Sequence, residues 1–303
     1  MTQPKRRRTR TVRPSSSGSR LFHRIAIIGV GLMGGSLGLA TRAKRLAGDV
    51  IGADRDAAAL RRAVKRGAID RPMAPAAAVR EADLVVLATP VGGFEAAVKA
   101  CAGAFAPGAI VTDVGSVKGG LIGRLEALLP PHVAYLSSHP LAGREQSGVE
   151  AASSTLFEGC RCVLTPGARS RPEIVERLTR YWEGLGSTVT IMTPEDHDRD
   201  LAVVSHLPHL VAYALVTTAL EAADRAPGLL QLTAGGFRDF TRIAASSPEM
   251  WRDICLENRP HIVAAMDHYR AIFDRFRALV ASGDGAALER AFEQARRVKR
   301  QLR

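Results

Sequence analysis

The sequence predicts an α/β Rossmann fold, a doubly wound parallel sheet, followed by an all-α helical second domain. Three observations lead to this prediction. Strand-like apolar runs alternate with helical segments from residue 23 to about residue 192, which is the pattern of repeated βαβ units. A glycine-rich turn follows the first run. After Pro194 the strand-like runs stop, and helical patterns continue to the end of the chain.

The length and charge of the chain fit this two-domain organisation. The chain has 303 residues and a net charge of +12, and two domains are expected at this length. Residues 1–22 carry seven Lys and Arg and no acid, and they are rich in Pro, Ser and Arg. We expect this basic tail to be disordered, and it lacks the apolar segment of a secretory signal.

Composition also indicates which binding partners and which cellular compartment to expect. Outside the tail the chain is only mildly basic, so nucleic-acid binding is not expected, because that needs a basic patch and a reading element. No apolar run approaches the length of about 20 residues that spans a bilayer, so no membrane contact is expected. Four scattered cysteines are typical of reduced thiols in a cytoplasmic protein.

The first domain is expected to cover residues 23–192 and the second residues 193–303. Strands are predicted at residues 24–30, 49–54, 83–89, 109–114 and 133–138. Two further runs, residues 160–165 and 188–192, flank a helix at 172–185 and are expected to extend the same sheet. Long helices are predicted at residues 198–224, 248–282 and 286–302.

The first βα turn has the GxGxxG pattern of dinucleotide-binding sites. Gly29 allows a tight turn, Gly31 lets the backbone approach a pyrophosphate, and Gly34 lets helix and strand pack closely. Leu32 and Met33 lie between the last two glycines, where free helical N–H groups would meet the phosphates. The pattern is weak alone, but here it follows a strand and opens a helix.

An acid after the second predicted strand favours NAD as the cofactor. Asp54 lies 20 residues after Gly34, where a carboxylate binds the ribose hydroxyls and repels the 2′-phosphate of NADP. The neighbouring Arg55 leaves NADP open, and Asp54 could also be a solvated acid at a strand end. Thr89, Pro90 and Asp113 follow later strands and should border the cofactor, because ligands bind at the carboxyl ends of such sheets.

Four further segments carry unusual patterns. They are VGSVKG (residues 114–119), SHPLAGREQSG (138–148), SHLPH (205–209) and GGFRDFTRIAASSPEMWRDI (235–254). Together with the leading glycine turn they resemble the prephenate dehydrogenase family, which includes arogenate and cyclohexadienyl dehydrogenases. The resemblance runs in order from about residue 23 to residue 260.

The resemblance implies an oxidative decarboxylation in tyrosine biosynthesis. Prephenate or arogenate would give a hydride to NAD, lose carbon dioxide and become aromatic as 4-hydroxyphenylpyruvate or tyrosine. His139 matches the family's catalytic histidine, and an imidazole is suited to accept a hydroxyl proton near neutral pH. Ser116 matches the serine that hydrogen-bonds this histidine and the substrate. From the residues alone, His139 could equally be a loop histidine before a proline.

The resemblance also implies a site for a small dicarboxylate substrate. Arg242 matches the substrate-binding arginine, and a guanidinium can hold a carboxylate through two hydrogen bonds. Asp239, three positions earlier, could hold Arg242 in place, or the two could form an ordinary surface pair. His206 matches a histidine that faces the substrate, whereas His209 is interpreted as structural. No metal site is expected, since no further ligand accompanies these two histidines.

Two further residues each have two alternative roles within this site. Arg144 stands where many family members carry a small hydroxyl residue, and it could add a carboxylate contact or bias the enzyme towards prephenate. Trp251 could pack near the substrate or belong to the core. The helical domain is expected to form a homodimer, mainly because the family does.

Two alternatives remain. Another two-domain dehydrogenase, of the β-hydroxyacid or 6-phosphogluconate type, would share the first 130 residues. Such enzymes are expected to carry a catalytic lysine in the first helix of the second domain, and residues 198–224 contain none. A non-catalytic NAD-sensing or nucleic-acid-binding protein is suggested by the basic tail. It would give His139 no role and would bind polyanions in a salt-dependent way.

Overall fold

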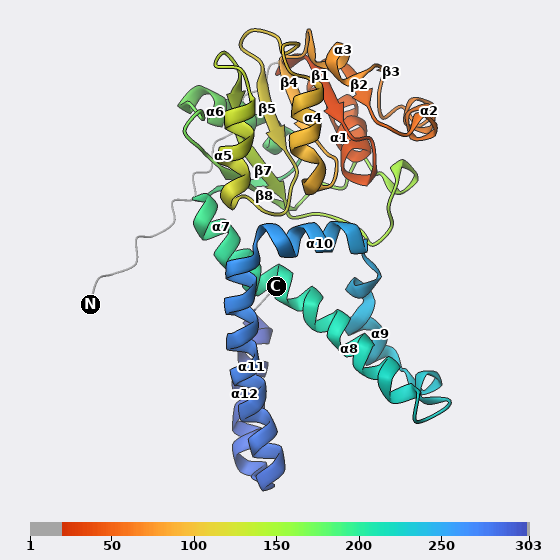
Figure 1. Cartoon of the computed structure of the whole chain (residues 1–303), viewed down its shortest axis with the longest axis vertical. Helices are drawn as coiled ribbons and strands as arrows, with labels where there is room; N and C mark the ends of the chain where they lie inside the picture. The colour runs from red at the N-terminus through yellow and green to blue at the C-terminus, as the bar shows by residue number, and fades with distance from the viewer. Residues whose placement is uncertain (1–19, 302–303) are drawn as a thin grey trace, which may run out of the picture.

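A six-stranded parallel sheet forms the centre of the first domain. The computed structural model describes residues 20–301 and places the sheet above two long helical arms (Figure 1). Its strand order is β3-β2-β1-β4-β5-β6. The strands are β1 (Phe22–Ile28), β2 (Ala47–Ala53), β3 (Arg71–Pro72), β4 (Leu84–Leu87), β5 (Ile110–Asp113) and β6 (Ala134–Tyr135). The predicted Rossmann fold with a helical second domain is confirmed.

Helices cover both faces of this sheet, which explains its continuous apolar strands. Ile25 and Ile27 of β1 belong to one buried core, together with Trp182. Ala26 and Ile28, which point to the other face, belong to a second core. The helices of this domain are α1 (Leu32–Ala43), α2 (Ala57–Lys65), α3 (Pro75–Val79), α4 (Phe94–Ala100), α5 (Gly119–Leu128) and α6 (Pro172–Gly184).

The expectation that the later strands extend the parallel sheet is wrong. β7 (Ser137–Pro140), β8 (Arg161–Thr165) and β9 (Thr188–Ile191) form a separate sheet, in which β7 is antiparallel to β8. The predicted strand at 133–138 is divided at Leu136, whose N–H still bonds to Val111 of the first sheet. From Ser137 onward the chain pairs with β8 instead. This change of sheet carries β7 towards the helical domain.

The predicted tail extends too far. Residues 1–19 lie outside the described part of the chain, but Phe22 is the first residue of β1 and is buried. Its ring makes an edge contact with Tyr181 and lies under the guanidinium of Arg177, 4.2 Å away. These contacts explain why the strand begins inside the segment expected to be disordered.

The second domain is helical and open. It begins with α7 (Pro194–Leu201), a π-helical turn (Ala202–His206) and α8 (Leu207–Ala223), which run on as one long helix. The chain continues through α9 (Gly235–Thr241) and a short turn, Arg242–Ala245, to α10 (Pro248–Glu257), α11 (Arg259–Ser282) and α12 (Gly285–Gln301). Residues 248–282, predicted as one helix, are divided at Asn258. One arm ends in α8 and α9, and the other is the hairpin of α11 and α12 (Figure 1).

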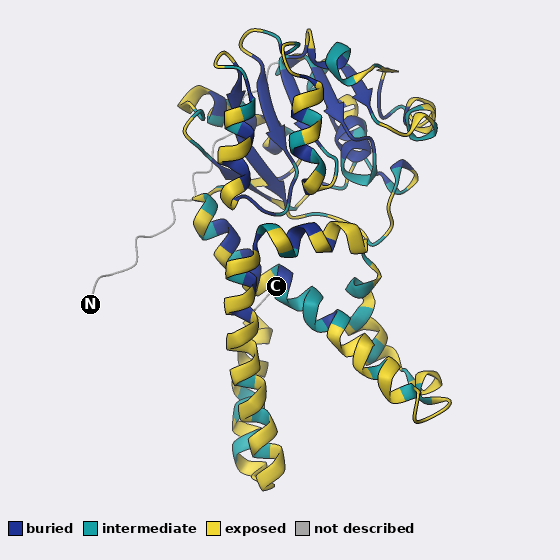
Figure 2. Ribbon diagram, viewed as in Figure 1, coloured by how far each residue is buried: buried dark blue, intermediate teal, exposed yellow. Residues whose placement is uncertain are grey.

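The arms consist largely of exposed residues, drawn in yellow in the ribbon of Figure 2, and many of these residues are apolar. Val204 is 71% exposed, Leu220 57% and Phe273 59%. The statement that no apolar run approaches the length of a membrane span is wrong for the helix Pro194–Ala223. This helix has the length and composition of a span, and only 22% of its most apolar stretch is buried. Histidines and small residues interrupt the run and conceal it in the sequence. A surface of this kind needs a partner to cover it.

Candidate functional site

The glycine turn has the geometry of a phosphate-binding loop. Gly29 has φ +98°, and a Cβ there would lie 2.7 Å from the backbone of Ala88 and Thr89. A Cβ on Gly34 would overlap the carbonyl oxygen of Gly29. A Cβ on Gly31, in contrast, would meet nothing within 4 Å. The space above Gly31 is therefore open, and Leu32 and Met33 begin α1 beside it with free N–H groups.

Asp54 lies directly after β2 and beside this turn. Its Oδ2 accepts the N–H of Val30 at 2.8 Å, and its Oδ1 accepts the N–H of Asp56 at 2.9 Å. Each carboxylate oxygen has a second lone pair, so the half-buried group retains acceptor capacity for ribose hydroxyls. Arg55 is exposed next to it. Glycine turn and acid together fit a bound dinucleotide.

The loop after β4 connects this edge of the sheet to the helical domain. Thr89 and Pro90 follow β4, and Thr89 is half-buried. The next turn, Val91–Gly93, donates the N–H of Gly92 to Oδ2 of Asp253 in α10 at 3.2 Å. The position of α10 is thereby linked to the loop that borders the dinucleotide site.

Asp113 does not lie open to a cofactor. Its carboxylate is fully buried and accepts from Lys118 Nζ at 2.7 Å and from Tyr135 Oη at 2.7 Å. It also accepts from Ser137 Oγ and the N–H of Gly115. The buried Lys118 ammonium also donates to the carbonyl of Ser138 at 2.8 Å. Instead of contacting the cofactor, Asp113 anchors the loop that carries Ser116.

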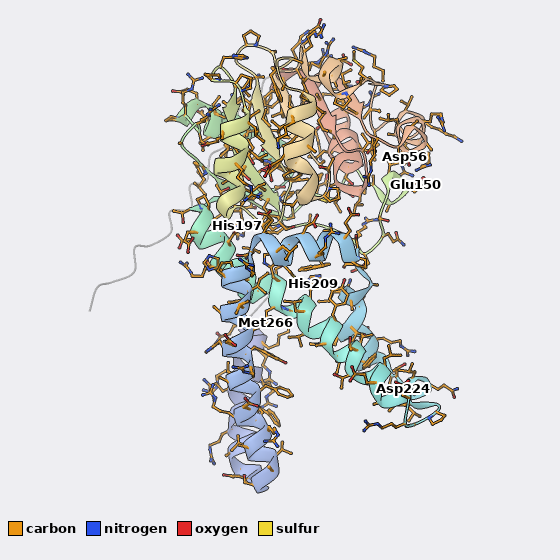
Figure 3. The ribbon with its side chains drawn as sticks, in the orientation of Figure 1. Asp56, Glu150, His197, His209, Asp224 and Met266 are labelled. Atoms are coloured by element: carbon orange, nitrogen blue, oxygen red, sulfur yellow. The ribbon has the colours of Figure 1, made fainter. Side chains whose placement is uncertain are left out.

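His139 lies inside β7, not just past a strand end as expected. It is buried, and its Nδ1 lies 2.8 Å from Nε2 of His197 on α7. His197 Nδ1 in turn lies 2.8 Å from Oδ1 of Asp198. Figure 3 shows His197 where the first domain meets α7. His139 therefore lies at the junction of the two domains.

The environment of His139 favours its neutral form. Burial is the main cause that lowers its pKa well below 6.5, and the neighbouring His197, Lys118 and His206 lower this pKa further. Burial also lowers the pKa of His197, against the opposing effect of Asp198. A neutral imidazole can accept a proton at neutral pH, which is what a general base requires.

His206 and Trp251 complete the buried side of the junction. His206 lies in the π-helical turn and is fully buried. Its Nδ1 is 3.1 Å from Asn258 Nδ2, while its Nε2 makes no side-chain hydrogen bond within the described residues 20–301. Burial lowers its pKa to about 4, against the opposing effects of Asp198 and the backbone of Ser116.

Trp251 is buried in the core and its ring centroid lies 6.0 Å from that of His206. It also stacks on His209, which bonds to the carbonyl of Ser205.

Ser116 makes no side-chain hydrogen bond to His139 within residues 20–301. It is half-buried on the loop after β5, and its backbone lies beside His206. The structure thus brings Ser116, His139, His206 and Trp251 to one junction.

The residues expected to bind a carboxylate lie at the exposed side of the domain junction. Arg242, 61% exposed, forms an ion pair with Glu145, which belongs to the loop after β7. The expectation that Asp239 holds Arg242 is wrong for the described residues. Asp239 is exposed on α9, and the loop brings Glu145 to the guanidinium instead. Arg144 is exposed beside Glu145. This ion pair connects the loop after β7 to the α8–α9 arm.

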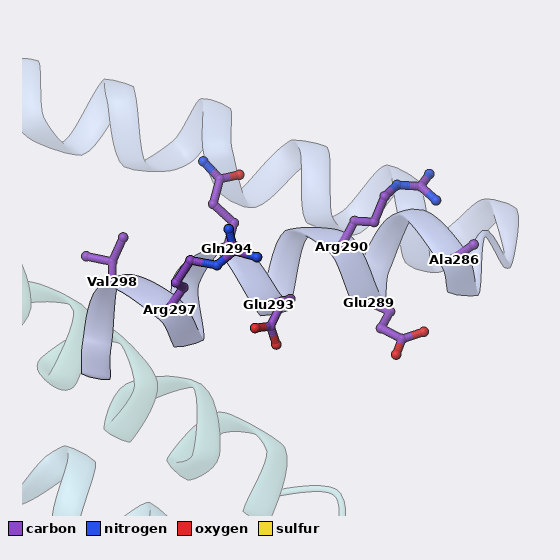
Figure 4. Close-up of a pocket in the computed structure, with 7 residues that line it drawn as sticks. All are labelled: Ala286, Glu289, Arg290, Glu293, Gln294, Arg297 and Val298. Carbon is purple, nitrogen blue, oxygen red and sulfur yellow. The ribbon is translucent and has the colours of Figure 1, made fainter. Parts of the chain in front are cut away.

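A separate hollow of about 660 Å³ lies along α12 (Figure 4). Its walls come from one helix and include four charged side chains; the lining residues are Ala286, Glu289, Arg290, Glu293, Gln294, Arg297 and Val298. It contains none of the residues described above. Because one helix alone lines it, we interpret it as the open side of an arm and not as an active-site cleft.

Sequence reasoning missed four residues of the junction: Lys118, His197, Asp198 and Asn258. Asp198 accepts the N–H groups of Lys118 and Gly119 at 2.9 and 2.7 Å. Asn258 Nδ2 donates to the carbonyl of Asp198 at 2.8 Å. The only signal in the sequence is a His-Asp pair at the start of the second domain, within a charged stretch. Within the described residues, no group of His, Cys, Asp and Glu is arranged to hold a metal.

Comparisons with known proteins agree for both domains. Residues 37–191 match the family model "Prephenate dehydrogenase, nucleotide-binding domain", and residues 193–294 match "Prephenate dehydrogenase, dimerization domain". The chain is 38% identical to cyclohexadienyl dehydrogenase of Zymomonas mobilis over 93% of this chain and 97% of that protein. It is 36% identical to prephenate dehydrogenase of Bacillus subtilis over 90% of this chain and 74% of that protein.

Two solved structures extend this similarity to three dimensions. Prephenate dehydrogenase from A. aeolicus, in complex with hydroxyphenyl propionate and NAD+, superposes with a TM-score of 0.87 at 35% identity, covering 95% of this chain and all of that one. Arogenate dehydrogenase from Synechocystis superposes with a TM-score of 0.77 at 28% identity, covering 92% of this chain and all of that one.

The buried histidines predict a loss of stability in acid. The unfolded state takes up protons near pH 6.5, whereas folded His206 does so only near pH 4. Between these values the unfolding free energy should fall with decreasing pH, by up to about 1.4 kcal/mol per pH unit for each such histidine. Urea unfolding of the wild type and of His206→Asn at several pH values measures this. The unfolding free energy of the variant should depend less steeply on pH than that of the wild type. An equal pH dependence in both proteins would contradict the lowered pKa of His206.

Proposed function

Because the chain belongs to the prephenate dehydrogenase family, we propose that it catalyses the oxidative decarboxylation of prephenate or arogenate with NAD. The proposal rests on one observation above all. A buried imidazole, His139, lies at the domain junction in the neutral form that proton abstraction requires. The product would be 4-hydroxyphenylpyruvate or tyrosine, so the enzyme would act in tyrosine biosynthesis.

The residues of the first domain fit NAD. The open space above Gly31 allows the pyrophosphate to approach the N-terminus of α1. Asp54 is available for the ribose hydroxyls and disfavours a 2′-phosphate. When bound, NAD accepts the hydride released from C4 of the substrate ring. The polar groups of this chain then have to position the substrate and take up the hydroxyl proton.

The chain's own part in the reaction is centred on His139. His139 takes the proton of the C4 hydroxyl while the hydride leaves C4, so that a carbonyl forms. Carbon dioxide then departs, the electron pair of the broken bond makes the ring aromatic, and the C4 oxygen, now a phenolate, takes its proton back from His139. Ser116 and His206 lie close enough to the junction to orient the hydroxyl and a substrate oxygen. The unpartnered Nε2 of buried His206 is a polar group that a substrate atom would satisfy.

The substrate class follows from the cations on the outer side of the junction. Arg242 would anchor a carboxylate once released from Glu145, and Trp251 would contribute packing behind His206. Arg144 lies beside Glu145 and would add positive charge near the same carboxylate. Such a charge favours the keto acid side chain of prephenate over the ammonium of arogenate.

We propose a homodimer formed through the helical arms. The match to a dimerization domain supports it, and so do the exposed apolar side chains of α8 and α11. The same pairing would cover the apolar helix Pro194–Ala223 without a membrane. The free thiols of all four cysteines fit a cytoplasmic enzyme.

Turnover tests the function directly. The purified protein is mixed with prephenate or arogenate, each with NAD and with NADP, and the reduced nicotinamide is followed at 340 nm. We expect turnover with at least one pair, NAD above NADP, and a loss of roughly 10²–10⁴-fold in kcat in His139→Asn. A protein that binds NAD but oxidises neither substrate would refute the proposal and favour a β-hydroxyacid dehydrogenase.

Two substitutions in the glycine turn distinguish an effect on NAD binding from an effect on folding stability. Gly31→Ala should leave the melting temperature unchanged, because the added Cβ meets no atom of the chain. It should weaken NAD binding at least tenfold, since the methyl group occupies the approach of the pyrophosphate. Gly34→Ala is the matched control and should lower the melting temperature, because its Cβ overlaps Gly29. Unchanged NAD affinity in Gly31→Ala, measured by calorimetry, would place the cofactor elsewhere.

The dimer is tested by analytical ultracentrifugation. Leu220→Glu and Phe273→Glu place a charge on the apolar faces of the two arms and should shift the mass towards that of a monomer. Val64→Glu, at an exposed apolar position on the first domain, is the control and should leave the mass unchanged. A wild-type protein that sediments as a monomer would contradict the proposal.

A further inference from the structure

Three side chains form an unbroken hydrogen-bonded chain across the domain junction. His139 Nδ1 lies 2.8 Å from His197 Nε2, and His197 Nδ1 lies 2.8 Å from Asp198 Oδ1. His139 belongs to β7 of the first domain, whereas His197 and Asp198 belong to α7 of the second. All three are buried, so water does not compete for these bonds.

The direction of each hydrogen bond follows from Asp198. Its Oδ1 accepts the N–H of Lys118 at 2.9 Å, and its Oδ2 accepts the N–H of Gly119 at 2.7 Å. A backbone N–H can only donate, and both groups lie at the start of α5, where the helix dipole favours an anion. Asp198 is therefore an ionised acceptor, and His197 must donate its Nδ1–H to it.

The positions of the ring protons on His197 and His139 follow from this direction. A neutral His197 with its proton on Nδ1 offers a lone pair at Nε2. His139 must donate its own Nδ1–H to that lone pair, and its Nε2 is left without a proton. Within residues 20–301 no group of the chain bonds to this Nε2. A histidine whose Nε2 carries a free lone pair can abstract a proton, whereas the other tautomer cannot.

We infer that His197 and Asp198 are positioning residues that hold His139 in the tautomer able to act as a base, and that they do so only when the two domains are docked. The inference rests on the proposed role of His139. When His139 accepts the hydroxyl proton at Nε2, it keeps its Nδ1–H and becomes a cation. The Asp198 carboxylate stabilises this cation through the hydrogen bond that neutral His197 accepts, whereas burial and the neighbouring Lys118 and His206 oppose it.

Asn258 makes this positioning dependent on the helical domain. Its Nδ2 donates to the carbonyl of Asp198 at 2.8 Å and lies 3.1 Å from His206 Nδ1. Asn258 lies between α10 and α11 and is itself buried. Any movement of α10 and α11 against α7 would therefore displace Asp198 as well as His206.

A shared metal ion does not explain this arrangement. An ion bound to both histidines would lie about 2.0–2.1 Å from each nitrogen and would hold those nitrogens farther apart than 2.8 Å. The separation is that of a direct N–H···N hydrogen bond.

NMR of histidine-labelled protein tests the tautomer without requiring turnover. The full-length protein is labelled with ¹⁵N-histidine, and long-range ¹H–¹⁵N correlations distinguish a protonated Nδ1 from a protonated Nε2. The signals of His139 are identified by their loss in His139→Asn. We expect the proton of wild-type His139 on Nδ1 at pH 7.5. A proton on Nε2 would overturn the inference, even if the enzyme turns over substrate.

Two variants at position 197 test the consequence for catalysis. Gln can accept the Nδ1–H of His139 through its side-chain oxygen, whereas Met has a similar length and no comparable acceptor. His197→Met should lower kcat about 10²–10⁴-fold, with KM and NAD affinity within threefold of wild type. His197→Gln should recover kcat to within about tenfold and keep the proton on Nδ1.

The outcomes separate this inference from the proposed function. Equal kcat in wild type and His197→Met, or equal losses in Met and Gln variants with a raised KM, would assign His197 a purely structural role. A wild-type protein that oxidises neither substrate would refute the proposed function, while the NMR result would still decide whether the tautomer is held as inferred.

Discussion

The arrangement of the site depends on the buried carboxylate of Asp198. It belongs to the helical domain, yet it accepts two backbone N–H groups from the start of α5 in the first domain. It also orients His197, and its backbone carbonyl is held by Asn258. Hydrogen bonds to a charged group contribute about 1.5–3 kcal/mol each, and a buried carboxylate that loses them is costly. This one residue therefore aligns the two domains and the histidine between them.

The first domain presents a matching set of buried polar groups. Lys118 gives its N–H to Asp198, while its ammonium bonds to Asp113 and to the carbonyl of Ser138 in β7. The same residue thus connects β5, β7 and α7. A buried lysine of this kind is costly unless it is paired and hydrogen-bonded, and here the ammonium has both a carboxylate and a carbonyl as acceptors. The pair keeps the Ser116 loop and His139 in fixed positions relative to each other.

Because β7 leaves the parallel sheet, His139 can reach the second domain. If residues 133–138 continued in one strand, His139 would follow the carboxyl edge of the first sheet. Because the chain changes sheet after Leu136, β7 pairs with β8, and His139 faces α7. The site is therefore built between the domains, and not on the Rossmann domain alone.

The parts of this site that depend on local spacing could be predicted from the sequence. The glycine turn and Asp54 each follow a strand whose apolar pattern is visible along the chain, whereas His139 is indicated by the resemblance to the family and not by its spacing. The division into β6 and β7 could not be predicted, because both halves have the same extended, apolar pattern. His197 and Asp198 lie in a charged stretch that reads as an exposed helix face. Only their long-range partners, Lys118 and His139, show that they are buried.

The ion pair of Arg242 is a second contact that local sequence patterns could not predict. Asp239 has the spacing of a helical partner, but Glu145 reaches the guanidinium from a distant loop. Periodicity along one helix cannot reveal such a competitor. In the apolar helix Pro194–Ala223, histidines and small residues conceal the length of the apolar run, and its exposure becomes visible only in the open arrangement of the arms.

The substitution Asp198→Asn tests whether Asp198, from the second domain, controls the proposed action of His139 as a base. The amide can offer its NH2 group to His197 Nδ1, which would reverse the tautomers of both histidines. The measurement is kcat together with the dissociation constant of NAD. We expect a kcat at least about 100-fold below wild type, with NAD affinity within threefold because the glycine turn is intact. A kcat within threefold of wild type would contradict it.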